Sequence, residues 1–220
     1  MSLAYNPYGL APVAHESGIV RPALGSGGGQ PYGGYTIASG YANNIFLNSP
    51  IMIDAATPTS NIILAAAFAS AAPPIPNASK ILGSFQGVEF TLATGRRTVS
   101  NFWPASTVPF ANSPTVAWIT RDPNITYQIQ ANGVVPATAM GNLASITANT
   151  TASGNATTGF STVGLDVATL LTPAANPTFV NQLRITGFAQ QIDNNPGDAF
   201  TQVIVKIAAH PDMPQPGVAY

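Results

Sequence analysis

Alternation of apolar and polar residues is clearest near the end of the chain, in residues 181–207. The segment NQLRITGFAQQIDNNPGDAFTQVIVKI contains two β-favouring runs on either side of a polar turn, which predicts a β-hairpin. If the two strands pair around Asn195, their apolar side chains share one face and stabilise the pair. The pairs predicted on that face are Leu183 with Ile207, Ile185 with Val205 and Gly187 with Val203.

The same register places Arg184 opposite Lys206 on the other face of the hairpin. Like charges directly opposite one another are mildly destabilising. Either an acidic side chain lies nearby, or both cations are solvated in a slightly different register. These two residues are the charged candidates for a contact with another protein.

Shorter β-like runs, separated by turn residues, recur from Tyr35 onward. Gly87 interrupts the alternation of one of them and indicates a β-bulge. The apolar, alanine-rich run 61–72 is compatible with a helix, but it lacks polar residues at helical spacing and we favour a strand. The predicted strands are 44–46, 51–53, 61–68, 80–91, 98–103, 115–120 and 126–130.

Together these runs predict an all-β fold, a small β-barrel or β-sandwich that forms a single domain over residues 36–207. Within it, the Thr/Asn/Ser-rich residues 142–164 predict a long surface loop. The segment LDVATLLT (165–172) predicts a short helical turn before Pro173, and residues 181–207 form the closing hairpin.

Extended segments are expected on both sides of this domain. Residues 1–35 predict an N-terminal arm, because Pro7, Pro12, Pro22 and Pro31 interrupt any helix or central strand and GSGGGQPYGG supplies a flexible joint. The arm also carries apolar residues, so part of it should pack on something. The proline-spaced residues 208–220 predict an extended C-terminal tail.

Charge is scarce in this chain. Only 7% of the residues are charged, whereas roughly 25% is usual in soluble proteins. The net charge of −1 gives no basic field for direct nucleic-acid binding, and the 45% hydrophobic content does not fit a disordered chain. Solubility must therefore come from uncharged polar residues or from surface that is buried in an assembly.

Compartment signals are few. The chain has no cysteine, which excludes a disulfide framework and a thiolate zinc site. The start MSLAYNPYGLAPVAHESG lacks the features of a signal peptide, and the most apolar run, NIILAAAFASAA, is too short to span a bilayer. We expect a soluble protein made in the cytoplasm, with no membrane partner.

The chemistry of a catalytic site is hard to find in the sequence. The two histidines, His15 and His210, fall in the proline-broken arm and tail, where they are expected to be exposed or at an interface rather than to act as bases. GFSTVG (159–164) has the spacing G-x-S-x-x-G, without the strand-turn-helix context of a nucleophile elbow. Glu89 lies within a strand and is expected to face outward rather than to form a glycosidase pair.

Ligand motifs are equally weak. DNNPGD (193–198) offers oxygen ligands without the spacing of a calcium loop, and GSGGG lacks the Lys-Ser/Thr of a P-loop. Trp103 and Trp118 form either a sugar-binding platform or, as we favour, part of the core. We therefore expect no catalytic residue, no cofactor and no metal, and predict that the protein is not an enzyme.

Seven short blocks, taken in order, resemble a group of tailed-bacteriophage head proteins that act as capsid cement or decoration proteins. Where such proteins often carry Gly-Asp-Pro-Val, this chain has Asn48-Ser49-Pro50-Ile51. The blocks are NPYGLAPV, GYANNIFLNSPIMI, ILGSFQGVEF, NFWPAST, RDPNITYQIQANG, NQLRITGF and GDAFTQVIVKIAAHP.

The resemblance implies a structural virion protein that binds the outer surface of an icosahedral phage head. It would bridge adjacent copies of the major capsid protein and stabilise the head against the pressure of packaged DNA. A homo-oligomer, trimer or dimer, is expected. The predicted interface residues are Tyr5, Pro7, Tyr8 and Leu10 in the arm, Arg184 and Lys206 on the hairpin, and Val218 and Tyr220 in the tail.

Two alternatives remain open at this point. One is a phage tail or fibre component, and the other is a carbohydrate-binding module that uses Trp103 and Trp118.

Overall fold

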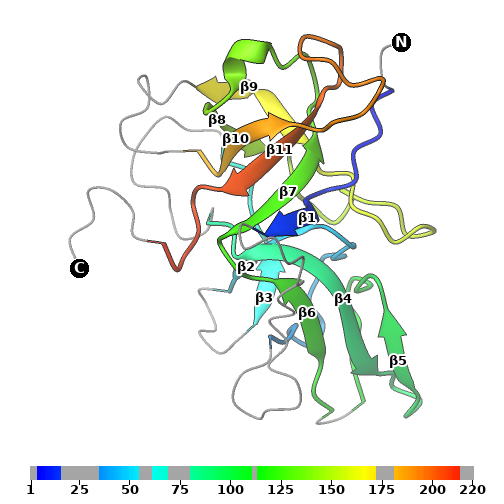
Figure 1. The fold of residues 1–220 in the computed structure, drawn as a ribbon. Helices are drawn as coiled ribbons and strands as arrows, with labels where there is room; N and C mark the ends of the chain where they lie inside the picture. The colour runs from blue at the N-terminus through cyan, green and yellow to red at the C-terminus, as the bar shows by residue number, and fades with distance from the viewer. Residues whose placement is uncertain are drawn as a thin grey trace.

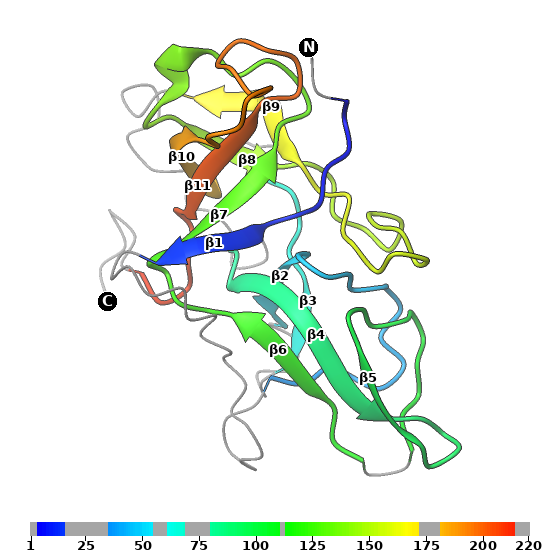
Figure 2. The same ribbon diagram turned by 45° about the vertical axis from the view of Figure 1, so that its right-hand side comes forward.

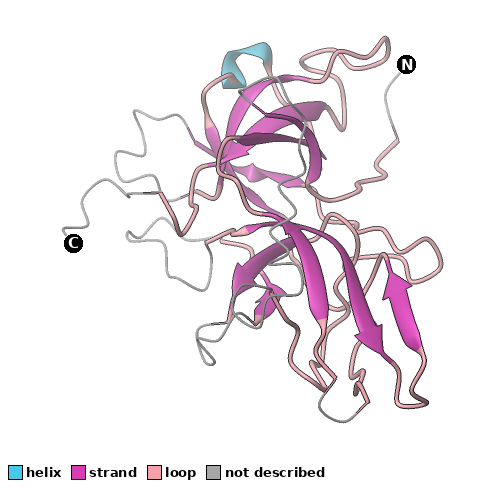
Figure 3. Cartoon of the chain, turned by 60° about the horizontal axis from the view of Figure 1, so that its bottom comes forward, coloured by secondary structure: helices cyan, strands magenta, loops and turns pink. Residues whose placement is uncertain are grey.

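Two antiparallel sheets pack together as a small β-sandwich in the computed structural model, which describes residues 4–15, 35–54, 61–68, 80–110, 113–171 and 181–213 (Figure 1). Strands account for nearly all of the regular structure. The helical part of the described chain is a single short turn, η2 (Ala137–Ala139) (Figure 3). The predicted all-β fold class is confirmed.

The first sheet has six strands in the order β1-β7-β11-β10-β8-β9. It curls, because Ala131 just after β7 forms a parallel bridge with Leu165 at the start of the far strand β9. The N–H of Asn132 also donates to the carbonyl of Leu165 at 2.9 Å. The strands are β1 (Ala11–His15), β7 (Ile125–Gln130), β8 (Leu143–Ile146), β9 (Leu165–Leu171), β10 (Leu183–Phe188) and β11 (Gln202–Ile207).

The second sheet has five strands built around the long strand β4 (Figure 2). Gly87, at φ 142°, lies at a bulge in the pairing of β4 with β6, as the sequence predicted. The strands are β2 (Pro50–Ile53), β3 (Ile62–Leu64), β4 (Gly83–Thr91), β5 (Arg97–Ser100) and β6 (Val116–Thr120).

The β2–β3 pair lies between two separate hydrophobic cores. Met52 and Ala65 belong to the core under the six-stranded sheet, whereas Ile51 and Leu64 belong to the core of the five-stranded sheet. Successive side chains of a strand point to opposite faces, so both faces of this pair are buried. This explains why β3 contains no alternating polar position: Ile62 and Leu64 belong to one core, and Ile63 packs against the other.

The closing hairpin has the predicted register as far as Ile185. Leu183 pairs with Ile207, Ile185 pairs with Val205, and Arg184 lies opposite Lys206. The register then shifts by one residue, so that Gly187 pairs with Ile204 and Phe188 with Val203. This bulge brings Phe188, rather than Gly187, against the core beside Val203.

Three predicted elements differ from the structure. Residues 44–46 contribute only a single bridge, between Ile45 and Trp103, instead of a strand. Residues 165–171 form the strand β9 instead of a helical turn, because they pair with β8 at the border of the six-stranded sheet. The predicted loop 142–164 begins with that partner strand, whose residues are all buried, and is irregular only after it.

The predicted N-terminal arm packs on the chain's own sheet over residues 4–15. Its strand β1 pairs with β7, from Ala11 opposite Gln128 to His15 opposite Ile125. Residues 16–34 of the arm and residues 214–220 of the predicted tail lie outside the described residues. The first residues of the tail continue the fold, since the carbonyl of Ala209 accepts from the N–H of Ile81 at 3.0 Å.

Candidate interaction surfaces

Four predicted interface residues lie in the segment just before β1. Leu10 has no exposed surface and belongs to the larger core, and Pro7 is buried as well. Both side chains are therefore buried within the fold itself, which corrects the prediction that they face a partner. Tyr5 is 42% exposed, and Tyr8 is half-buried, so these two reach the surface.

The other four predicted interface residues have two different outcomes. Arg184 is exposed and Lys206 is half-buried, opposite one another on the outer face of the β10–β11 pair. This register excludes the alternative in which the two cations are offset along the strands. Val218 and Tyr220 lie outside the described residues.

Both histidines of the chain contact the short turn between β6 and β7. His15 Nε2 lies 3.0 Å from a carboxylate oxygen of Asp122. Arg121 donates to the carboxylate of Asp212 from Nε at 2.9 Å, and His210 Nε2 lies 2.8 Å from the carbonyl oxygen of Arg121. The ends of β1 and of the described C-terminal segment are thus fastened to one turn.

His210 is fully buried, which corrects the prediction that it is exposed or at an interface. Its Nε2 also lies 2.9 Å from the carbonyl oxygen of Leu82, and its Nδ1 accepts from the backbone N–H of Asp212 at 3.1 Å. This arrangement fits the neutral ring with its proton on Nε2. Burial lowers the pKa of His210, against the opposing effect of the nearby Asp212 carboxylate. Its role is structural, because every polar atom of the ring is used in holding the chain.

The carboxylates are dispersed and used locally. Glu89, predicted to face outward on its strand, is half-buried and forms an ion pair with Arg97 of the neighbouring strand β5. Asp166 accepts from the side-chain amide of Asn132 at 3.0 Å. No group of three or more His, Cys, Asp or Glu side chains suited to a metal ion occurs among the described residues.

Buried side chains of GFSTVG and of the DNNPGD turn are used in hydrogen bonds within their own loops. Ser161 of GFSTVG is buried, and its hydroxyl accepts from the N–H of Val163 at 3.2 Å. In the DNNPGD turn, Asn194 is buried and its amide donates to the carbonyls of Ala189 and Gln202, both at 2.8 Å. These side chains stabilise their own loops.

The tryptophans do not form a shared exposed platform. Trp103 is fully buried and packs edge-on against Phe90, with 5.1 Å between the ring centroids. Trp118 is half-buried and lies over Gly87, where an added Cβ would come within 3.1 Å of its ring. The core interpretation of Trp103 is therefore correct, and the sugar platform built on both tryptophans is wrong.

Exposed apolar side chains gather instead at two ends of the molecule. Ten large apolar side chains are exposed in the described part of the chain, and six of them belong to two groups. The first group, here called the η2 end, consists of Val134, Met140 and Ile192, which are 49%, 59% and 98% exposed. Its two loops lie together at the top of Figure 1, and the N–H of Gly197 joins them by donating to the carbonyl of Val135 at 2.9 Å.

The second group, here called the β5 end, consists of Val99, Val108 and Phe110, which are 65%, 61% and 51% exposed. It lies at the opposite end of the molecule, at the bottom of Figure 2. The N–H of Phe110 donates to the carbonyl of Thr91 at 2.9 Å and fastens this segment to the end of β4.

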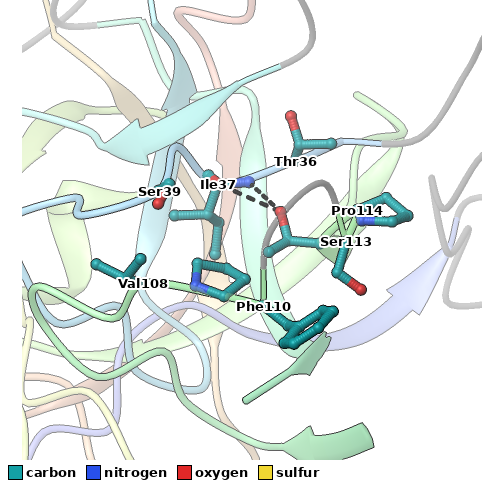
Figure 4. A pocket seen from close by; sticks show the side chains of 9 residues that line it. Thr36, Ile37, Ser39, Val108, Phe110, Ser113 and Pro114 are labelled. Carbon is teal, nitrogen blue, oxygen red and sulfur yellow. Dashed lines mark hydrogen bonds between the residues drawn. The ribbon is translucent and has the colours of Figure 1, made fainter. Parts of the chain in front are cut away.

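A hollow of about 400 Å³ opens beside the β5 end (Figure 4). Val108 and Phe110 line it, opposite Ile37, and its floor is fixed because the Thr115 hydroxyl bonds both the N–H and the carbonyl of Ile37 at 3.0 and 3.1 Å. All of its lining residues are uncharged: Thr36, Ile37, Ser39, Val108, Pro109, Phe110, Ser113, Pro114 and Thr115. The arrangement suits an uncharged protein surface rather than a charged substrate.

Sequence reasoning missed both of these ends. Val134, Met140 and Ile192 lie in loops, where no alternating pattern separates buried from exposed apolar residues. The available signal was indirect: large apolar residues such as Ile192 stand alone among polar turn residues.

No helix of the described part is long and apolar enough to cross a membrane. Comparisons of this chain with models of protein families, with curated proteins and with solved structures found no match.

Proposed function

We propose that the chain is a structural virion protein, a capsid cement or decoration protein. It binds the outer surface of an icosahedral phage head, is made in the host cytoplasm and carries out no catalysis. Its partners are the major capsid protein and further copies of itself, as a trimer or a dimer. Nucleic acid and membrane are not among its direct partners in this proposal.

The observation that carries the proposal is the pair of apolar ends. A chain with only seven basic and eight acidic residues exposes the η2 end and the β5 end at opposite extremes of the fold. Interface cores are enriched in aromatic and Met side chains, and Phe110 and Met140 supply one exposed side chain of this kind at each end. The ordered motif blocks, which span the chain from Asn6 to Pro211, point to the same class of protein.

Two contact surfaces on one folded chain suit a clamp between neighbouring coat subunits. Each contact alone can be modest, since a typical interface buries about 800 Å² per partner. Binding at one end holds the other end close to the next subunit, and this effective concentration raises the occupancy of the lattice. Separation of the two subunits then requires that one contact be broken.

The proposal is tested by mixing the purified full chain with undecorated heads of the phage that encodes it and sedimenting the heads. We expect the protein to pellet with the heads at a saturating ratio. Ile192→Ser at the η2 end and Phe110→Ser at the β5 end should each weaken binding about tenfold or more. A chain that stays entirely in the supernatant would contradict the proposal.

The matched control is Ile53→Ser, because Ile53 is 36% exposed but lies in β2, in the middle of the molecule. Its binding should equal that of the unmodified chain. Equal losses for all three variants would show that the two ends are not the binding surfaces.

A tail or fibre component is the second candidate, because exposed apolar ends would also suit a stacked tail structure. Electron microscopy of labelled protein bound to virions separates the two. Signal over the whole head lattice supports cement, and signal at one vertex or along the tail supports the alternative.

A further inference from the structure

A second hollow, distinct from both apolar ends, lies between the N-terminal segment and the loop that follows β8. Its volume is about 310 Å³. We call it the Tyr8–Phe160 groove, and its lining residues are Asn6, Pro7, Tyr8, Asn155, Thr158, Phe160, Ser161 and Thr162. We propose that the Tyr8–Phe160 groove is a binding site for a neutral oligosaccharide.

The two walls of the groove are held by one central segment. The N–H of Leu10, at the end of the first wall, donates to the carbonyl of Asn48 at 2.8 Å. In the second wall the N–H of Ser161 donates to the carbonyl of Leu47 at 2.9 Å, and the carbonyl of Gly159 accepts from the N–H of Leu47 at 2.8 Å. A groove fixed in this way pays little ordering entropy when a ligand binds.

The apolar part of the groove consists of Pro7 and two aromatic residues. Phe160 is 43% exposed although its loop is tied down on both sides, so its ring is presented to solvent rather than to the core. Tyr8 is half-buried across the groove, with its hydroxyl donating to Gln202 Oε1 at 3.2 Å. An exposed ring over a rigid backbone can stack against the C–H face of a sugar.

The polar part consists of amides and a hydroxyl with spare bonding capacity. Asn6 and Thr162 are exposed, and their side chains make no hydrogen bond within the part of the chain that the structure describes. Asn155 accepts the N–H of Thr157 at 2.8 Å through its amide oxygen. Its two Nδ2 donors make no hydrogen bond within the described residues and can bond a ligand. Donors and acceptors of both kinds are thus offered within one hollow.

Charge decides the ligand class. All eight lining residues are uncharged, so the groove supplies neither a cation for a phosphate or carboxylate nor an anion for an amine. The amides and hydroxyls would be left unpaired by a purely apolar ligand, which costs free energy. A ligand with one apolar face and many neutral hydroxyls satisfies both requirements, and this describes a neutral sugar.

The test is titration of the ¹⁵N-labelled full chain with maltotetraose, cellotetraose and chitotetraose, followed by amide chemical-shift perturbation. At least one tetrasaccharide should shift the amide signals of Asn6, Tyr8 and residues 155–162, with a dissociation constant of about 1 mM. Phe160→Ala should weaken that binding about tenfold, and Asn6→Ala several-fold. Both side chains are exposed, and unchanged spectra elsewhere will show that the variants are folded.

The control is Phe110→Ala, which removes an equally exposed ring from the other hollow and should leave sugar binding unchanged. Absence of perturbation by all three sugars at about 10 mM would overturn the proposal, as would perturbation centred on Phe110. Chemical-shift changes in the groove that appear only with peptides of the coat protein would also overturn the proposal. Head sedimentation with Phe160→Ala separates the two proposals, because loss of sugar binding should leave head binding intact.

Discussion

Gly9 lies where the N-terminal segment crosses the rest of the fold, at a point that leaves no room for a side chain. Its φ is +79°, and a Cβ added there would come within 2.2 Å of the carbonyl oxygen of Asn48. Asn48 itself has a positive φ of 65° and accepts the N–H of Leu10 through that same oxygen. The contact is between two backbones, so a flexible side chain cannot relieve it.

We predict that Gly9→Ala lowers the free energy of unfolding by about 2–4 kcal/mol, because it adds a backbone clash to the strain of a positive φ. The matched control is Gly40→Ala, since Gly40 has φ +74° but open space around it. It should cost only about 1–2 kcal/mol. Urea denaturation measures both, and equal losses for the two variants would contradict this account of Gly9.

His210 makes stability depend on pH. Burial lowers its pKa, so the folded state favours the neutral ring, while the unfolded chain takes up a proton below about pH 6.5. The unfolded state therefore binds more protons as the pH falls, and the free energy of unfolding should decrease from about pH 7.5 to about pH 5. Chemical denaturation at a series of pH values measures this slope.

The variants for this experiment are His210→Gln and His15→Gln. The first should be less stable at neutral pH, because it loses the bonds to Leu82 and Arg121, but its stability should vary less over this range. The second keeps the buried ring and should retain most of the slope. A slope that survives in His210→Gln would show that another group is responsible.

At the scale of elements, the β2–β3 pair is the feature that ties the two cores together. Three successive residues of β2 have different surroundings: Ile51 lies in one core, Met52 in the other, and Ile53 is exposed. A strand with one solvent face would bury only alternate residues.

We predict that Ile51→Ala and Met52→Ala each lower the free energy of unfolding by about 2–5 kcal/mol. Ile53→Ala, the neighbouring control, should cost less than about 1 kcal/mol. Thermal and urea unfolding measure the three variants. A small effect of either Ile51→Ala or Met52→Ala would mean that one face of the strand is not packed as described.

Elements with a clean alternating pattern could be predicted from the sequence, whereas the two border strands of the six-stranded sheet could not. The register of the β10–β11 pair was predicted as far as Ile185 because Leu183, Ile185, Val205 and Ile207 alternate with polar residues. The strands β1 and β9 were missed. Both lie at the borders of the six-stranded sheet, where a proline such as Pro12 and a half-exposed, irregular pattern are tolerated.

The candidate surfaces were less predictable than the fold. The scarcity of charged residues predicted a surface that contacts other proteins. The alternation of apolar and polar residues, however, does not indicate which loop residues remain exposed. Leu10 and Ile192 have similar apolar side chains in irregular or proline-flanked sequence, yet one is fully buried and the other is 98% exposed. Only the packing of distant segments decides between them.

At the scale of the whole molecule, the proposed role requires both apolar ends to act together. Binding through one end would decorate a head without strengthening it, whereas binding through both would resist the separation of neighbouring subunits. The η2 end and the β5 end belong to different sheets, and these sheets are joined through the doubly buried β2–β3 pair. The proposed bridging role therefore depends on this pair.

The most direct test of this bridging role is the temperature at which DNA leaves filled heads, measured by a DNA-binding dye with and without saturating protein. Heads decorated with the unmodified chain should release DNA at a higher temperature than bare heads. Heads saturated with Phe110→Ser or Ile192→Ser, each bound through its remaining end, should release DNA at nearly the temperature of bare heads. Equal release temperatures for bare heads and heads saturated with the unmodified chain would contradict the bridging role.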